Sequence, residues 1–191
     1  MDRKEKDRIF EKEFAVHADA LLTFAYHLTL YDSSAEDLVQ ETFMKAWRFI
    51  EKYDQGTNAK AWLFTIMKNA FINDYRKKGK QPKKVDIDEA IFTLDDDNGT
   101  PLNSYVDLRQ EMLENLMGDE VTMAINSLSL DSRTVVLLCD VEGFTYEEIA
   151  KITGVPVGTV RSRLFRARNM LKAKLKEYAE SFGYTDKRKT S

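Results

Sequence analysis

The stretch that decides the fold is TYEEIAKITGVPVGTVRSRLFRARNMLKAKLKEY, residues 145–178. It begins with a capping box, because the side chain of Thr145 can cap a helix and Glu148 can reach back to the Thr145 backbone N–H. Gly154 stands where a left-handed residue ends that helix, and Pro156 presets φ near the start of the next one. This pattern predicts a helix-turn-helix, whose second helix enters the major groove of DNA.

The second helix of this motif has an apolar side and a strongly basic side. Val160 and Leu164, four residues apart, are expected to face the first helix. The basic residues are Arg161, Arg163, Arg166, Arg168, Lys172, Lys174 and Lys176. A basic helix on its own is often only a solvated surface. Here it belongs to a helix-turn-helix and carries four arginines, which fork onto guanine edges and phosphates, so we expect it to bind DNA.

Charge is distributed unevenly along the rest of the chain. The 191 residues, 43% of them hydrophobic, suffice for one or two small domains, and the formal net charge is only −3. Residues 85–120 nevertheless contain eleven acids and a single base, Arg109, whereas bases dominate from Gly158 onward. An acidic middle segment can mask the basic end or mimic nucleic acid.

The sequence also predicts the compartment. Cys139 is the single cysteine, so an internal disulfide is impossible and a reducing environment is expected. The N-terminal residues show no signal-peptide pattern, and no stretch approaches the ~18 apolar residues that span a bilayer. We therefore expect a soluble, cytoplasmic protein without membrane insertion.

Three helices are predicted in the front part of the chain. Apolar residues recur at three- and four-residue steps over residues 9–30, from about 34 to 52, and over 59–77. Ser33 or Ser34 is expected to cap the second helix, and Thr57 or Asn58 the third. Three capped helices with short connections make a compact α-helical domain.

The remaining segments complete an all-α fold of two small helical domains joined by a flexible acidic linker. Helical periodicity returns at Leu108 and Val121, and Asp131 or Ser132 is expected to cap a helix over residues 133–142. The predicted division is a front domain at 1–78, a linker at 79–108, a rear domain at 109–180 and a polar tail at 181–191.

No catalytic or metal-binding set is convincing. His17 and His27 both fall inside the first helix, where we expect surface or boundary positions, and one thiol does not complete a structural zinc site. The run Asp95–Gly99 suggests a calcium loop, but its ligand positions do not fit one. We therefore predict a binding protein and not an enzyme, with no metal and no cofactor.

Three segments carry a family resemblance. The strings AEDLVQETFMKAWRFI (35–50), AWLFTIMKNAFINDYRKK (61–78) and VPVGTVRSRLFRARNML (155–171) resemble the extracytoplasmic-function (group IV) sigma factors of the sigma-70 family. Their order along the chain also agrees. The resemblance implies a subunit of bacterial RNA polymerase that recognises promoters and helps to open the DNA strands.

The resemblance also implies residue roles. The β′ coiled coil of core polymerase would contact Asp37, Gln40 and Glu41. The promoter −10 element and the melted strand would contact Thr57, Asn58, Ala59, Lys60, Trp62, Asn69, Asn73, Arg76 and Lys77, although burial habits favour Trp62 as a core residue. The −35 element would be read by Arg161, Ser162, Phe165 and Arg166, with its phosphates held by Thr159, Arg163 and Arg168. Phosphate contacts place the helix and base contacts specify the sequence.

The implied partners are core RNA polymerase, through its β′ coiled coil and β flap, promoter DNA, and an anti-sigma factor. One alternative is a helix-turn-helix regulator that binds duplex DNA without core polymerase and uses its front domain as a sensor. Another is an adaptor whose basic helix binds an acidic protein. A regulator that acts without polymerase gives no promoter-specific transcript with core polymerase, whereas a sigma factor does. An adaptor for an acidic protein shows no sequence-dependent DNA binding.

Overall fold

The computed structural model describes residues 2–78 and 119–184, and within these ranges the chain is helical without a β-strand. This confirms the all-α prediction. The front elements are α1 (Arg3–Ile9), the π-helical turn η1 (Phe10–Phe14), the 3-10 turn η2 (Ala15–His17), α2 (Ala18–Thr29), α3 (Asp32–Arg48), the 3-10 turn η3 (Ile50–Lys52) and α4 (Ala59–Lys78). The rear elements are α7 (Asp119–Asn126), α8 (Leu130–Val136), the π-helical turn η4 (Leu137–Val141), α9 (Tyr146–Thr153), α10 (Val157–Lys174) and α11 (Lys176–Ser181).

The first predicted helix is interrupted. It starts earlier than residue 9, because Asp2 caps α1 by accepting a hydrogen bond from the Glu5 N–H at 2.7 Å. The π-helical turn then brings Phe10 and Phe14 to two parts of one aromatic cluster. The Phe10 ring lies 5.4 Å from that of Phe43, and the Phe14 ring lies 5.1 Å from that of Tyr53.

Two of the predicted front caps can be compared with the structure. α3 begins at Asp32 with no side-chain cap, so the prediction that Ser33 or Ser34 caps it was wrong. Both serines lie inside the first turn of the helix, and the N-cap position is taken by Tyr31. For α4 the Asn58 alternative is confirmed, because its Oδ1 accepts a hydrogen bond from the Ala61 N–H at 2.9 Å.

In the rear domain, the predicted caps have mixed outcomes. Ser129 caps α8 by accepting a hydrogen bond from the Ser132 N–H at 3.4 Å, so neither Asp131 nor Ser132 is the cap. α8 thus begins three residues before the predicted start, which allows Leu130 to enter the core. By contrast, the capping box of α9 and its left-handed C-cap, Gly154 at φ +73°, are confirmed.

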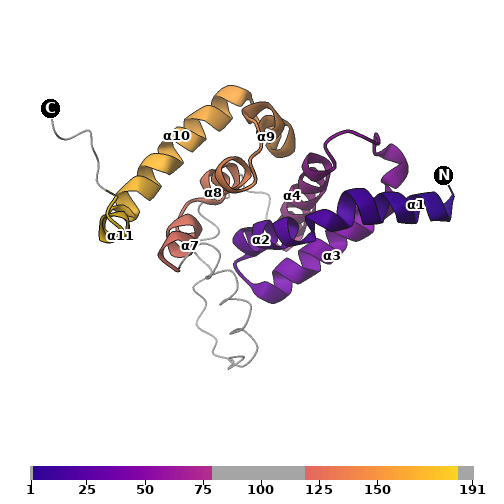
Figure 1. Ribbon diagram of the computed structural model, residues 1–191, viewed down its shortest axis with the longest axis horizontal. Helices are drawn as coiled ribbons and strands as arrows, with labels where there is room; N and C mark the ends of the chain where they lie inside the picture. The colour runs from indigo at the N-terminus through magenta and orange to yellow at the C-terminus, as the bar shows by residue number, and fades with distance from the viewer. Residues whose placement is uncertain (1, 79–118, 185–191) are drawn as a thin grey trace.

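The two domains pack against each other and share one hydrophobic core (Figure 1). α4 lies against α9, and α2 contacts α8. Across this interface the Phe64 ring meets the Phe144 ring edge-on at 5.2 Å. The packing places the start of α4 beside the first helix of the helix-turn-helix.

The predicted linker at 79–108, the helix expected from Leu108 and most of the tail lie outside the described residues. The same holds for the Asp95–Gly99 run. The domain boundary at residue 108 therefore stays a prediction.

Candidate nucleic-acid and protein interfaces

The helix-turn-helix presents α10 as a recognition helix with two distinct faces. The Thr145 backbone N–H donates to the Glu148 carboxylate at 2.9 Å, and the Glu148 backbone N–H donates to the Thr145 hydroxyl oxygen at 3.3 Å. This reciprocal pair fixes the start of α9. Val160 and Leu164 are buried against the core, as predicted. Phe165, on the opposite side of the same helix, is 69% exposed. An aromatic ring so placed is available to a partner and contributes little to the fold.

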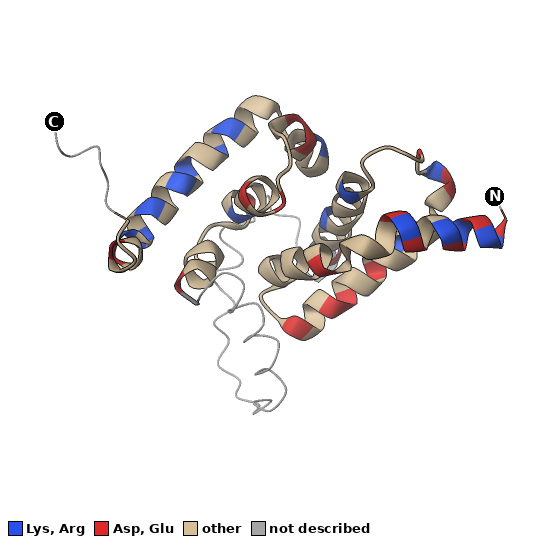
Figure 2. Ribbon diagram, viewed as in Figure 1, with Lys and Arg blue, Asp and Glu red and all other residues tan. Residues whose placement is uncertain are grey.

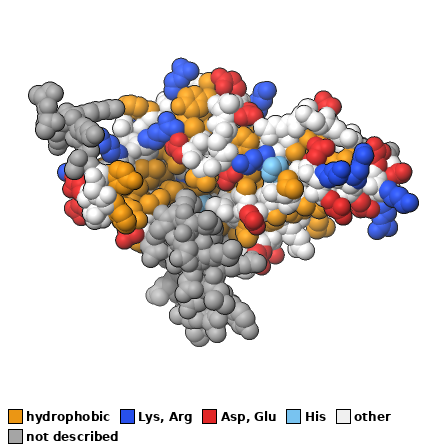
Figure 3. Space-filling model, in the orientation of Figure 1, with side chains coloured by type: hydrophobic (Ala, Val, Ile, Leu, Met, Phe, Trp, Pro, Cys, Tyr) orange, Lys and Arg blue, Asp and Glu red, His pale blue; other side chains and the backbone are white. Residues whose placement is uncertain are grey.

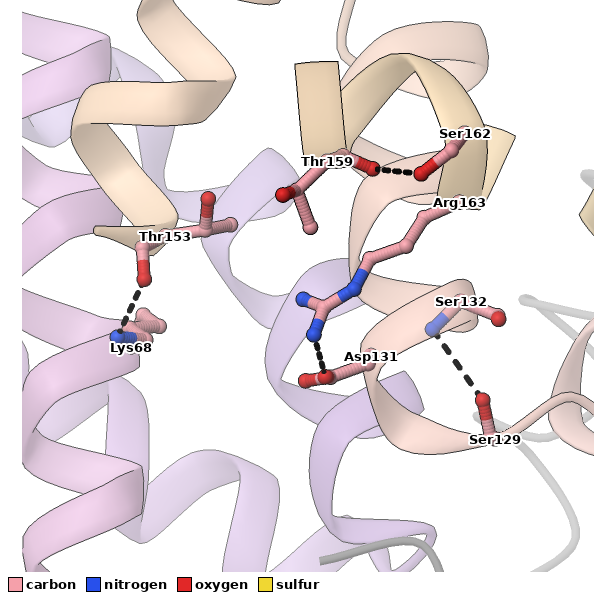
Figure 4. A network of polar contacts seen from close by, with 8 residues as sticks. All are labelled: Lys68, Ser129, Asp131, Ser132, Thr153, Thr159, Ser162 and Arg163. Carbon is pink, nitrogen blue, oxygen red and sulfur yellow. Dashed lines mark hydrogen bonds and ion pairs between the residues drawn. The ribbon is translucent and has the colours of Figure 1, made fainter. Parts of the chain in front are cut away.

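The residues predicted to meet the −35 element fall into two groups. Arg161, Ser162, Phe165 and Arg166 are exposed along the recognition helix, where Figure 2 shows a series of cations and Figure 3 shows hydrophobic and cationic side chains interspersed over the rear domain. The Ser162 hydroxyl donates to the Thr159 carbonyl at 3.0 Å (Figure 4). This first group has the exposure that base-edge contacts require.

The second group, Arg163 and Arg168, is held by carboxylates of the rear domain. Arg163 forms an ion pair with Asp131 (Figure 4). Arg168 donates from Nη2 and Nε to the two carboxylate oxygens of Asp140, at 2.5 and 3.1 Å. The hydrogen bond with Asp140 is the main cause that raises the pKa of Arg168 above its ordinary value. These pairs orient both guanidinium groups before any phosphate arrives.

The predicted base-capturing residues lie on a short loop between η3 and α4, which we call the capture loop (residues 54–58). Its turn is closed by Thr57, whose hydroxyl and backbone N–H both donate to the Asp54 carbonyl, at 2.6 and 3.2 Å. Thr57 and Asn58 are exposed, whereas Ala59 is only 8% exposed. The half-buried Trp62 packs its ring 5.3 Å from Phe14, in agreement with a core position.

Further along α4, Asn69 and Asn73 are exposed, one turn apart. Arg76 and Lys77 belong to the last turn of α4, but their side chains lie outside the described part of the chain. Four residues predicted to line one strand path thus share one helix.

The rear domain covers the start of α4 with acidic side chains. The Asn58 amide donates to the Glu148 carboxylate at 2.6 Å. The Lys60 ammonium lies 2.7 Å from the Glu142 carboxylate and donates to the Glu142 carbonyl at 2.9 Å. Lys68, one turn beyond Phe64, donates to the Thr153 carbonyl at 3.0 Å (Figure 4). Groups predicted to meet DNA therefore bind the second domain in this structure.

A buried arginine joins the domains deeper in the interface. Arg133 is 1% exposed and donates to the His27 carbonyl at 2.8 Å and the Leu128 carbonyl at 3.3 Å. His27 belongs to the last turn of α2, whose carbonyl ends carry partial negative charge, and a cation is stabilised there. Burial still lowers the pKa of Arg133 to about 10.

His27 itself is fully buried, so the prediction of a surface or boundary position was wrong for this residue. Its Nδ1 lies 2.6 Å from Asn126 Oδ1, and its Nε2 is buried without a hydrogen-bond partner. Burial is the main cause that lowers the pKa of His27, and the nearby Arg133 charge lowers it further. The helical period of α2 could not indicate that His27 is buried, because the residues that cover it belong to the second domain. His17 is only half-buried.

α3 presents a polar outer face away from the core. Asp37, Gln40 and Glu41 are all exposed, as predicted, and Figure 2 shows acidic residues along this helix. Met44 lies one turn beyond Gln40 and is 67% exposed. An apolar side chain surrounded by acids and an amide suits a protein partner, in which a central apolar contact is bordered by polar groups.

Within residues 2–78 and 119–184, no cluster of three or more His, Cys, Asp or Glu side chains could hold a metal ion. None of the helices in the same ranges is long and apolar enough to cross a membrane.

Sequence reasoning missed three contributors to these interfaces. Glu142 was read only as a helix end, Arg133 as part of a predicted helix, and Tyr53 received no role. Tyr53 is 5% exposed and donates a hydrogen bond from its hydroxyl to Glu13 at 2.5 Å. Each of the three acts on residues far away in the sequence, and a local pattern does not show such a contact.

Fold and interfaces together define an all-helical, two-domain DNA-binding protein with a helix-turn-helix in its rear domain. Residues 14–81 match the family described as Sigma-70 region 2, and residues 118–171 match Sigma-70, region 4. The chain belongs to the extracytoplasmic-function (ECF) sigma factors of the sigma-70 family, which are transcription initiation factors.

Relatives support this membership. The ECF RNA polymerase sigma factor EcfG of Rhodopseudomonas palustris is 37% identical over 87% of this chain and 86% of its own length. The ECF RNA polymerase sigma-E factor of Haemophilus influenzae is 39% identical over 78% of this chain and 79% of its own. SigE of Mycolicibacterium smegmatis is 35% identical over 85% of this chain, which spans 60% of that relative's length.

Solved structures agree on the fold. The sigma factor RpoE of Bartonella quintana, determined in complex with the anti-sigma factor NepR, has a TM-score of 0.66 and 35% identity, over 88% of this chain and 98% of that one. CnrH, determined with the cytosolic domain of CnrY, has a TM-score of 0.61 over 90% of both chains, at 24% identity. The second likeness concerns the fold alone.

Proposed function

We propose that this chain binds core RNA polymerase in the cytoplasm and directs it to specific promoters, without catalysing a reaction itself. The observation that carries the proposal is the separation of two exposed faces. The recognition helix presents Arg161, Phe165 and Arg166 on one domain, and α3 presents an acidic face around Met44 on the other. A regulator that acts on DNA alone has no need of the second face.

In the rear domain, the exposed residues of the recognition helix contact base edges of the −35 element. Arg161 and Arg166 supply forked donors for guanine, and Phe165 supplies an apolar contact such as a thymine methyl group requires. Arg163 and Arg168 contact phosphates, for which their ion pairs with Asp131 and Asp140 hold them ready. The Arg168–Asp140 pair is exposed, and such a pair contributes little to stability, so a phosphate can replace its carboxylate at small cost.

In the front domain, Asp37, Gln40 and Glu41 contact the β′ coiled coil, with Met44 at the edge of the same contact. The capture loop receives an unstacked base of the −10 element. The exposed face of α4, with Asn69 and Asn73, guides the separated strand together with Arg76 and Lys77. Unstacking a base costs a few kcal/mol, so a shaped pocket must repay it. The β flap contacts the rear domain.

The closed packing of the two domains must open during this work. Positions −10 and −35 are roughly 25 base pairs apart, which is ~85 Å of B-form DNA at ~3.4 Å per step. Two domains that share one core cannot reach both elements at once. In addition, Lys60 is paired with Glu142 and the Asn58 amide is bound to Glu148, so neither side chain is available to the −10 strand. We infer that polymerase binding separates the domains and uncovers the capture loop.

An anti-sigma factor is a further proposed partner. Its support is the likeness to a sigma factor solved with NepR. Such an inhibitor covers the α3 face and contacts both domains while they are away from polymerase. Recovery of the free chain from its native cells, with polymerase as its sole protein partner, contradicts this part of the proposal.

The test is run-off transcription with purified core polymerase and fragments of genomic DNA. We expect promoter-specific transcripts with the wild-type chain. Charge reversal by Glu41→Lys should weaken polymerase binding by at least about ten-fold, because a like charge at an interface costs several kcal/mol. Asp19→Lys, which reverses an exposed acid on α2 of the same domain, is the matched control and should bind normally.

Duplex DNA binding without any promoter-specific transcript favours a helix-turn-helix regulator that acts without polymerase. If Glu41→Lys and the wild type bind core polymerase with equal affinity, the α3 face is not the polymerase contact.

A further inference from the structure

A buried tyrosine, Tyr53, contacts the capture loop from the protein interior. Tyr53 immediately precedes the loop, and its ring packs edge-on against Phe14 at 5.1 Å and lies 5.2 Å from the Trp62 ring. Its hydroxyl lies 2.5 Å from Glu13 Oε2 and 3.1 Å from the Thr57 carbonyl oxygen. A buried phenol thus contacts both the first helical segment and the loop.

The π-helical turn η1 explains how Glu13 reaches this position. Most π-helical turns are single insertions of one residue that redirect the side chains around them, and they occur frequently at functional sites. In η1, Phe14 is fully buried next to Tyr53, while the preceding Glu13 remains partly exposed and points its carboxylate to the tyrosine hydroxyl. The turn therefore aims a packing residue and an acceptor at the same side chain.

Tyr53 stays a hydrogen-bond donor over the physiological pH range. Burial, followed by the hydrogen bond with Glu13, raises the pKa of Tyr53 to about 12. The hydroxyl has donor geometry toward both the Glu13 carboxylate, at 2.5 Å, and the Thr57 carbonyl, at 3.1 Å. Because Thr57 closes the turn onto Asp54, holding its carbonyl holds the whole loop.

We propose that Tyr53, held by Glu13, is a positioning residue that fixes the capture loop in the shape that selects one unstacked promoter base. This inference rests on the proposed role of the loop. Its exposed polar groups, on Thr57 and Asn58, come from consecutive residues, and hydrogen bonds discriminate between bases only when donor and acceptor positions are fixed. The chain places no aromatic residue in the loop itself, so selection depends on this fixed geometry.

The experiment uses the full chain assembled with core polymerase. The probes are fluorescent single-stranded oligonucleotides that carry a −10 element from mapped start sites, with each of the four bases at the captured position. The variants are Tyr53→Phe, which removes the hydroxyl alone, and Glu13→Gln, which removes the charge of the acceptor. Matched controls are Tyr31→Phe and Glu11→Gln, both at exposed positions outside the loop contacts.

We expect both variants to lose about ten-fold in the ratio of affinities between the preferred base and the other three, as loss of a hydrogen bond to a charged group predicts. Binding to core polymerase and to −35 duplex should be unchanged. The controls should keep the wild-type ratio. Mapped start sites should spread to promoters with other bases at this position.

Two results overturn the proposal. The first is a polymerase with Tyr53→Phe that keeps the wild-type ratio of affinities between the preferred base and the other three. The second is a base preference that decreases only as much as the folded fraction of each variant, measured by thermal unfolding. In that case Tyr53 has only a structural role. If wild-type polymerase itself shows no base preference and no promoter-specific transcript, the proposed function fails as well, which is a distinguishable outcome.

Discussion

The recognition helix and the capture loop are both proposed to contact promoter DNA, but they differ in how accessible they are. Along the recognition helix, Arg161, Phe165 and Arg166 are exposed. At the capture loop, Asn58 and the adjacent Lys60 are bound by Glu148 and Glu142 of the other domain. In this closed arrangement the chain can meet duplex DNA through its rear domain, while its front site is covered by its own acids.

The same comparison shows why the acids lie where they do. Each π-helical turn lies next to an acid of these contacts: η1 contains Glu13, which accepts a hydrogen bond from Tyr53 beside the capture loop, and η4 ends immediately before Glu142. η4 also contains Asp140, which holds Arg168 of the recognition helix. η4 thus orients a cation for DNA through Asp140, and the residue that follows it, Glu142, competes with DNA for Lys60.

The largest effect is expected from Arg133→Ala, which weakens the packing of the two domains against each other. The change leaves the His27 and Leu128 carbonyls without their donor and creates a cavity, at a cost of about 2–4 kcal/mol. We expect the capture loop to become accessible to single-stranded DNA. Urea unfolding and fluorescence energy transfer between the domains measure the two consequences.

Arg133→Lys is the matched variant, because it keeps a cation and one donor group and should lose less. If Arg133→Ala leaves the domains as compact as in the wild type, the buried arginine does not hold them together.

On the accessible side, Arg166→Ala should cost ~1–3 kcal/mol at one base pair of the −35 element, as loss of an arginine–guanine fork does. Single-stranded −10 DNA should bind as before. Competition binding against duplexes with every substitution in the element measures this. Equal weakening on all sequences makes Arg166 a phosphate contact instead.

On the covered side, the double variant Glu142→Gln with Glu148→Gln removes both competing charges. Glutamine at 148 can still complete the capping box, so α9 should remain intact. We expect affinity for single-stranded −10 DNA to rise about ten-fold, since hydrogen bonds to charged groups are worth about 1.5–3 kcal/mol. Glu147→Gln, at an exposed neighbouring position, should change nothing. No gain in the double variant means that these acids do not shield the loop.

The smallest effect is a pH dependence of closure. The pKa of His27 is lowered in the closed form by burial and by Arg133, and separation of the domains returns it toward its ordinary value near 6.5. The contribution of His27 to closure is therefore fully present above pH ~6.5 and is lost as the pH falls below it, by at most about 1.4 kcal/mol per pH unit.

Energy transfer between the domains across pH 5–8 measures this dependence. His27→Gln should abolish most of it. The pKa of His17 is lowered by burial and by Lys60 of its own domain, whereas Glu142 of the other domain raises it, so His17→Gln is measured in parallel to separate its contribution from that of His27. A closed fraction that rises as the pH falls contradicts the assignment.

Local sequence patterns predicted the rear motif well. The capping box of Thr145 and Glu148, the left-handed Gly154 and the buried Val160 all depend on neighbours within a few residues. Asp37, Gln40 and Glu41, which the resemblance places in a contact with a protein partner, are all exposed on α3.

What sequence reasoning could not predict depends on distant partners. His27 is buried because Asn126 and Arg133 of the other domain enclose it. The π-helical turn at Phe10–Phe14 suits the aromatic cluster it enters, and its residues alone show an ordinary helical period. Long-range packing therefore accounts for the burial of His27 and accompanies the π-helical turn, and neither can be seen in a local pattern.

The most direct test of the account is the distance between the domains, measured by energy transfer between labels at Asp19 of α2 and Glu177 of α11. The labelled chain is compared free in solution and as part of a polymerase that is transcribing from a mapped promoter. The account predicts a compact free chain and an increase by several tens of ångströms on the promoter, because the two DNA elements are ~85 Å apart. A compact distance in the actively transcribing complex contradicts it.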